Sequence, residues 1–152
     1  MPKVDLIVIA LSSPILIGVY KENQLIKTYE SELQSSEYLP EAFAELLENY
    51  EIETVSYANG PGSFMAIKMS YLFLKSLEIV NGVKLYAALA FEFNGYTPIK
   101  ALGKLYFHYE NGEIVTRPLG DVALKSMSLP NVLELHKYST LTEPNYVLPA
   151  VN

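Results

Sequence analysis

Cysteine and tryptophan are both absent from this sequence of 152 residues. Without cysteine the chain has no disulfide bonds, no thiolate nucleophile and no cysteine-based zinc site, and we therefore expect a cytoplasmic protein. Charged residues are also sparse, at 18%, whereas hydrophobic residues make up 50% of the chain. This composition excludes an intrinsically disordered polypeptide, because such chains hold too few hydrophobic residues to form a core.

A long hydrophobic run is missing as well. The longest uncharged stretch, residues 6–20, is shorter than the about 20 residues that a membrane-spanning helix needs. Ser12-Ser13-Pro14 interrupts it, and no small-residue pattern typical of a signal-peptide cleavage site follows it. We therefore expect a soluble protein that does not associate with membranes.

Positive charge is scarce in the first part of the chain. Residues 1–64 hold three Lys or Arg and ten Asp or Glu, whereas residues 65–152 hold eight and seven. Such an acidic half repels a phosphate backbone, so we expect no nucleic-acid binding by the chain alone. Two interpretations of the acidic half stay open, a solvated surface and a surface that attracts a basic partner.

Hydrophobic patterning predicts three strands at the start of the chain, over residues 4–11, 15–20 and 24–31. The first is almost wholly apolar, which is typical of a strand buried on both faces. Tight turns at residues 12–14 and 22–23 join the strands, so an antiparallel meander is expected.

A first helix is predicted after the meander, because five apolar residues share one helical face. They are Leu39, Phe43, Leu46, Leu47 and Tyr50. We expect Ser35 or Ser36 to cap its start, with Pro40 in the first turn, where proline is tolerated. Four glutamates lie on another face, where a solvated surface is a simpler explanation than an acid–base or metal site. They are Glu37, Glu41, Glu45 and Glu48.

Further along, a fourth strand is predicted over residues 52–58 and a second helix over residues 65–80, capped by Ser63. A fifth strand over residues 83–89 returns parallel to the fourth. The second helix is apolar around most of its circumference, which indicates burial on more than one side. Either the second half of the chain or another protein provides the additional cover.

After Gly95 the hydrophobic pattern of the sequence becomes less regular. Asn111-Gly112 lies between two short alternating segments and is a strong hairpin signal. Residues 119–152 contain several prolines and no long helical pattern. We therefore divide the chain into a first lobe, residues 1–93, and a reduced second lobe with a tail, residues 94–152.

The predicted element order and the loop after the fourth strand together resemble a known family. Gly60, Pro61, Gly62, Ser63 and Phe64 match the Gly-Pro-Gly-Ser-Phe motif of the TsaB (YeaZ) family, in the same strand–loop–helix context. Residues 143–146, Glu-Pro-Asn-Tyr, are similar to the closing Pro-x-Tyr segment of that family. Met65 and Ala66 depart from it, because they replace the Thr and Gly that follow the motif.

The resemblance implies an α/β fold of the ASKHA type, shared by actin-like and Hsp70-like ATPases and related to RNase H, with a complete N-terminal lobe and a reduced C-terminal lobe. In active relatives the first strand ends in an Asp that organises a metal ion and nucleotide phosphates. Ala10 takes that place here, and a methyl group cannot hold Mg²⁺. The resemblance therefore implies a non-catalytic protein that needs no cofactor and no metal.

The partners implied by the resemblance belong to threonylcarbamoyladenosine (t6A) biosynthesis on tRNA. They are a TsaD-like catalytic subunit and a TsaE-like ATPase, and tRNA is met only through the complex. The family pairs through its first two helices, which suggests five partner-facing residues, and a charged residue in place of Phe73 is expected to weaken pairing. The five are Tyr38, Ala42, Met69, Phe73 and Leu77.

Several alternatives remain open from the sequence. The loop at Gly60–Ser63 is either an anion or nucleotide contact, or a tight turn in which two glycines supply positive φ. The chain as a whole could instead be a nucleotide-binding enzyme of the same fold, or a homodimeric structural protein. His108 and His136 have no partner at metal-ligand spacing, and we expect His108 to be an ordinary half-buried residue of a strand.

Overall fold

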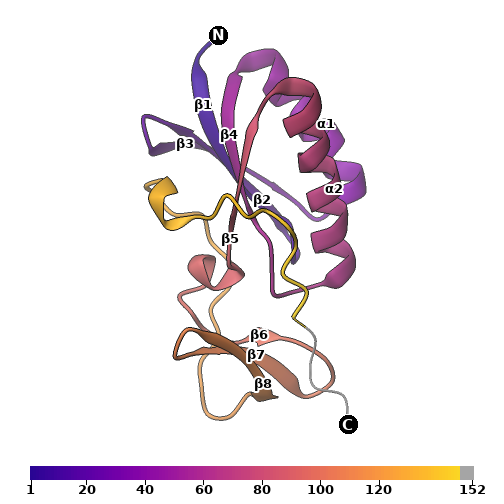
Figure 1. Cartoon of the computed structure of the whole chain (residues 1–152), viewed down its shortest axis with the longest axis vertical. Coiled ribbons are helices and arrows are strands. Elements are labelled where there is room, and N and C mark those ends of the chain that lie inside the picture. Colours follow the sequence, from indigo (N-terminus) through magenta and orange to yellow (C-terminus); the bar gives the residue numbers. More distant parts are fainter. Residues whose placement is uncertain (148–152) are drawn as a thin grey trace.

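Two β-sheets, two α-helices and a long C-terminal segment make up the described part of the chain (Figure 1). The computed structural model describes residues 1–147, so the last five residues of the predicted second lobe, 94–152, lie outside the described ones. The first sheet has the strand order β3-β2-β1-β4-β5, and the second sheet has the order β6-β7-β8.

The elements follow the predicted order along the chain. The first sheet and its helices are β1 (Lys3–Ile9), β2 (Ile15–Lys21), β3 (Gln24–Ser31), α1 (Ser35–Asn49), β4 (Glu51–Ala58), α2 (Phe64–Asn81) and β5 (Lys84–Ala88). They are followed by the 3-10 turn η1 (Ala90–Phe93), the strands β6 (Ile99–Lys100), β7 (Leu105–Glu110) and β8 (Glu113–Pro118), and the 3-10 turn η2 (Leu135–Lys137). The predicted meander and the two predicted α-helices are thus confirmed.

Strand β1 lies at the centre of the first sheet, antiparallel to β2 and parallel to β4. Because successive side chains point to opposite faces of a strand, its apolar run supplies both faces. Leu6 and Val8 belong to one buried cluster, whereas Ile7 and Ile9 belong to the other. Strand β5 pairs with β4 in parallel, as the crossover through α2 requires.

Helices α1 and α2 cover one face of this sheet and pack side by side (Figure 1). Leu39, Phe43 and Leu46 of α1 are fully or almost fully buried there. The Phe43 ring meets the Phe73 ring edge to face, with centroids 5.4 Å apart. Among residues 1–147, no helix combines the length and the apolar character that crossing a membrane would require.

We call residues 119–147 the C-terminal strap, and residues 127–138 of it pack on the opposite face of the sheet (Figure 1). The strap reaches the β3 edge, where the Leu25 amide donates to the Asn131 carbonyl at 3.0 Å. It then crosses to the β5 edge, where Ala87 and Ser139 exchange two backbone hydrogen bonds of 2.8 Å. Leu133 is buried on this face, so the strap takes the place of a second helical layer.

The second sheet is a hairpin with one short additional strand. Asn111 and Gly112 have φ values of 52° and 79°, which confirms the predicted two-residue turn. His108 is more deeply buried than predicted, with 6% of its surface exposed. Its imidazole Nε2 lies 3.2 Å from the Pro118 carbonyl oxygen, so the ring is held against the adjacent strand β8.

The helix ends agree only in part with the predicted caps. Ser63 caps α2, as predicted, and Gly82 ends it in the left-handed region. The predicted cap of α1 was wrong, because Gln34 is the capping residue and makes no side-chain cap. The Ser35 hydroxyl donates instead to the Ala10 carbonyl, at 3.3 Å. Pro40 lies one turn further into α1 than predicted.

Candidate functional site

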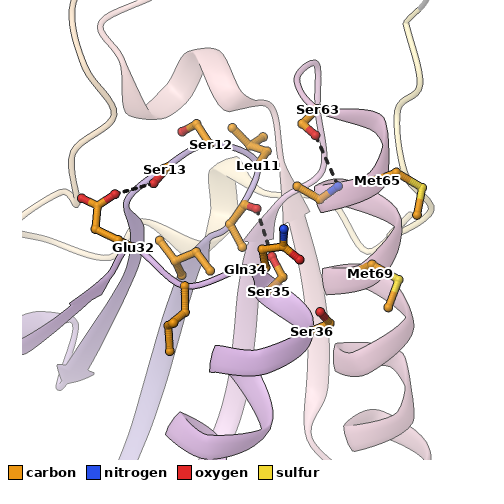
Figure 2. A pocket seen from close by; sticks show the side chains of 14 residues that line it. Leu11, Ser12, Ser13, Glu32, Gln34, Ser35, Ser36, Ser63, Met65 and Met69 are labelled. Carbon is orange, nitrogen blue, oxygen red and sulfur yellow. Dashed lines mark hydrogen bonds between the residues drawn. The ribbon is translucent and has the colours of Figure 1, made fainter.

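A cavity of about 500 Å³ opens where three segments of the first lobe meet (Figure 2). The end of β1 and the turn after it contribute Ala10 and the Ser12–Ser13 pair, and the segment leading into α1 contributes residues 32–36. Met65 and Met69 from the start of α2 complete the wall. Its size is within the range of small-molecule sites, and the start of each helix reaches it.

Three of the hydroxyl groups that line this cavity have hydrogen-bond partners within the chain. Ser13 donates to the Glu32 carboxylate at 2.7 Å, and Ser35 donates to the Ala10 carbonyl. The Ser63 hydroxyl accepts the backbone N–H of Ala66 at 3.4 Å. Such local bonds hold the three segments together, and the cavity wall is therefore shaped before any ligand enters.

The lining of the cavity carries a single carboxylate, and no group of potential metal ligands among the described residues surrounds it. Glu32 is the one charged side chain in its lining, and Ala10 presents a methyl group at the end of β1. A divalent cation such as Mg²⁺ needs one or two carboxylates together with phosphate or water oxygens. Within residues 1–147 no three His, Asp or Glu side chains are grouped in a way that would hold a metal ion.

The Gly60–Phe64 loop contacts the C-terminal strap. Gly60 has φ of +134°, and a Cβ atom built on it would lie 2.3 Å from the Asn145 carbonyl oxygen. The tight-turn alternative expected positive φ at both glycines, but Gly62 does not have it; a Cβ there would lie 3.2 Å from Leu11 Cβ. Gly60 is therefore required both for its positive φ and because Asn145 leaves no space for a side chain. Gly62 is required because its backbone packs closely on Leu11.

Four contacts hold the end of the strap to the end of β4 and to this loop. The Tyr57 hydroxyl donates to the Thr142 carbonyl, and the Asn59 side-chain amide donates to the Glu143 carbonyl at 3.0 Å. The Asn145 amide donates to the Asn59 carbonyl at 2.8 Å, and the ring centroids of Phe64 and Tyr146 lie 4.4 Å apart. The two sequence segments that carry the family resemblance are therefore in contact. Ser63 is the one loop residue that lines the cavity.

Among these contacts, burial has the largest effect on the pKa of the Tyr57 hydroxyl. It raises the pKa of the Tyr57 hydroxyl, and the nearby Tyr71, Tyr146 and Glu143 raise that pKa further. A raised pKa keeps the phenol protonated, and hence a hydrogen-bond donor to the strap, at all physiological pH values.

The five predicted partner-facing residues lie in different environments. Ala42 and Leu77 belong to the core beneath the helices and expose only 5% and 8% of their surface. Tyr38 and Phe73 are half-buried against the same core, and Met69 is half-buried at the cavity. Partner contact through these residues stays a prediction, and Ala42 and Leu77 leave little surface for it.

A second row of residues on α2 faces outward instead, and we call it the α2 stripe; four of its members are exposed and Met69 is half-buried. The α2 stripe consists of Met65, Met69, Leu72, Ser76 and Ile79. The spacing of four, three, four and three residues places them along one side of the helix, as in the seam of a helical bundle. Met65 exposes 59%, Leu72 52% and Ile79 76% of its surface. The spacing of these residues in the sequence is enough to place them on one side of the helix. It does not show whether this side or the opposite one faces solvent.

Comparison with known proteins identifies relatives in structure but not in sequence. No protein-family model matches the chain, and no curated protein matches it. A Pseudomonas aeruginosa protein described as similar to the peptidase YeaZ matches with a TM-score of 0.58 and 15% identity, over 81% of this chain and 69% of its own.

YeaZ from the same organism matches with a TM-score of 0.56 and 14% identity, over 86% of this chain and 71% of its own. Identities this low establish the fold and not the family. The chain is therefore a mixed α/β protein with a YeaZ-like fold.

Proposed function

We propose that this protein is a non-catalytic scaffold subunit of the TsaB type, with an ASKHA-type lobe that pairs with a TsaD-like catalytic subunit. In that complex, located in the cytoplasm, the TsaD-like subunit transfers a threonylcarbamoyl group to tRNA adenosine. A TsaE-like ATPase joins the same assembly, and tRNA reaches this chain only as part of it. The observation that carries the proposal is the α2 stripe on a YeaZ-like fold.

The α2 stripe supports pairing because its exposure is costly. Single exposed apolar side chains are ordinary on a protein surface, whereas several on one side of a helix, here Met65, Leu72 and Ile79, form a patch of the kind that marks an interaction site. Covering Met65, Leu72 and Ile79 would contribute on the order of 1 to 3 kcal/mol each when burial is complete. Knobs-into-holes packing of a partner helix fits their spacing.

The residues of the cavity support a non-catalytic role. Phosphoryl and acyl-phosphate chemistry needs groups that neutralise developing negative charge, usually a metal ion or basic side chains. Ala10 offers a methyl group, and the one charged lining residue, Glu32, has the wrong sign. We therefore assign the chemistry to the partner and the structural support to this chain.

The test is the affinity of the purified chain for the TsaD-like protein of the same genome, measured by isothermal titration calorimetry. We expect Leu72→Asp to weaken binding at least about tenfold, since it places a carboxylate in the apolar seam. Leu72 is a better probe than Phe73, because Phe73 also packs on Phe43 within the chain.

The matched control is Leu141→Asp, the same change at an exposed leucine of the strap. It should leave affinity unchanged. Equal affinities of the wild type and both variants would contradict the proposed docking face. No association of the wild type at micromolar concentrations would contradict the proposed function itself.

A further inference from the structure

The cavity and the α2 stripe are continuous. Met65 and Met69 are the first two members of the stripe, and both also line the cavity (Figure 2). Leu33, at the mouth, adds an exposed apolar side chain on the α1 side. A partner helix packed along the α2 stripe would therefore reach the opening of the cavity. A side chain at that end of the partner helix would enter the cavity.

The charges of the cavity indicate an uncharged occupant. Glu32 would repel an anion, and its Ser13 hydrogen bond keeps the carboxylate at the cavity. The start of α1 and the start of α2 both line the same space, and the partial positive charge of helix N-termini disfavours a cation. Glu32 disfavours an anion and the helix N-termini disfavour a cation. Neither a negatively nor a positively charged group therefore gains much free energy by entering the cavity.

The lining also indicates which uncharged group fits. Leu11, Ile15, Leu33 and the two methionines provide apolar surface, and thioether sulfurs make favourable contacts with aromatic rings. Ser12 and Ser36 add exposed hydroxyls at the rim, which suit the polar tip of a tyrosine or tryptophan. These two residue types dominate binding energy at protein interfaces.

We propose that the cavity receives an aromatic side chain of the partner, seated between Met65 and Met69 and flanked by the start of α1. This inference rests on the proposed function and names the chemistry of the partner at one end of the docking face. The aromatic ring anchors the complex, while the rest of the α2 stripe provides the seam.

Filling the cavity tests the proposal on the whole chain. Ser36 is an exposed residue of α1 at the cavity, so Ser36→Trp should occupy the space with the chain's own ring. We expect at least a tenfold loss of affinity for the TsaD-like protein. Glu48→Trp, the same new side chain at an exposed position near the far end of α1, should bind like the wild type. Thermal unfolding of both variants verifies that they fold.

Methionine methyl NMR supplies an independent readout in the complex. An aromatic ring seated between Met65 and Met69 should shift both methyl resonances upfield when the partner is added. Met127 packs on the other face of the sheet and should not shift. The proposal requires both results, so wild-type affinity of Ser36→Trp or unshifted Met65 and Met69 methyls would overturn it.

The outcomes also separate this inference from the proposed function. If the wild type binds and Leu72→Asp weakens binding, while Ser36→Trp binds as the wild type does, docking stands and the aromatic anchor is overturned. If the wild type does not associate with the TsaD-like protein, both proposals fail.

Discussion

Gly60 illustrates how a single residue connects the loop to the strap. Its φ of +134° is a conformation that residues with a side chain rarely adopt, and the Asn145 carbonyl oxygen occupies the space of a Cβ atom. Neither fact is visible in the sequence, which shows only a Gly-Pro-Gly turn. The sequence indicated the motif, but the contact with a segment more than 80 residues away depends on the tertiary fold.

We expect Gly60→Ala to reduce the free energy of unfolding by about 2 to 4 kcal/mol, because it adds a steric overlap to an unfavourable φ. Gly82→Ala is the matched control, since Gly82 also has a positive φ but has no atom within 4 Å of the added Cβ. It should cost about 1 kcal/mol. Urea denaturation measures both, and equal losses would contradict the steric account.

Ionisation of Tyr57 should affect stability only at alkaline pH. The folded state raises the pKa of this phenol above the value of about 10 in an unfolded chain. Below about pH 10 both states keep the proton and the stabilisation is complete. Above it the unfolded chain releases the proton first, so stability falls as the pH rises.

Tyr57→Phe separates this contribution from that of other tyrosines. We expect the variant to lose about 1 to 3 kcal/mol at neutral pH, since the buried Thr142 carbonyl loses its donor. Its stability should also decline less steeply between about pH 9 and 11 than that of the wild type. Parallel pH profiles, obtained by chemical denaturation, would contradict the assignment.

At the scale of elements, α2 explains why the sequence predicted the helix but not its orientation. Ile67, Ser70, Leu74 and Leu77 are buried, and their spacing of three, four and three residues resembles that of the exposed α2 stripe. Both rows have bundle-like spacing, so periodicity alone cannot decide which one faces the sheet. The predicted contact residues Phe73 and Leu77 lie on the inward side for this reason.

The strap is the element that the sequence predicted least. It has almost no regular secondary structure and is held by a few long-range hydrogen bonds and by Leu133, which is 3% exposed. Hydrophobic periodicity detects helices and strands, and the strap has neither pattern. Its packing on β1 and β5 became visible only in three dimensions.

Leu133→Ala should therefore reduce the free energy of unfolding by about 2 to 5 kcal/mol, because it leaves a cavity under the strap. Leu141 belongs to the same strap but is 83% exposed, and Leu141→Ala should change stability by no more than about 0.5 kcal/mol. Thermal and urea unfolding test the pair. A small loss for Leu133→Ala would mean that the strap contributes little to the core.

At the scale of the whole molecule, the first sheet is a complete two-sided layer. The helices cover one face and the strap covers the other, so both faces of β1 are buried by the chain itself. The division at residue 93 stays a prediction, since the strap belongs by sequence to the second part and packs on the first. The α2 stripe, of which Met65, Leu72 and Ile79 are exposed apolar side chains, stays uncovered after this packing.

The central claim is that this surface binds a TsaD-like protein. Size-exclusion chromatography with light scattering tests it most directly, on the chain alone and then mixed with that protein. We predict a one-to-one complex in the mixture, replacing the monomer or homodimer of the chain alone. Unchanged separate species at micromolar concentrations, whether monomer or homodimer of this chain, would contradict the claim.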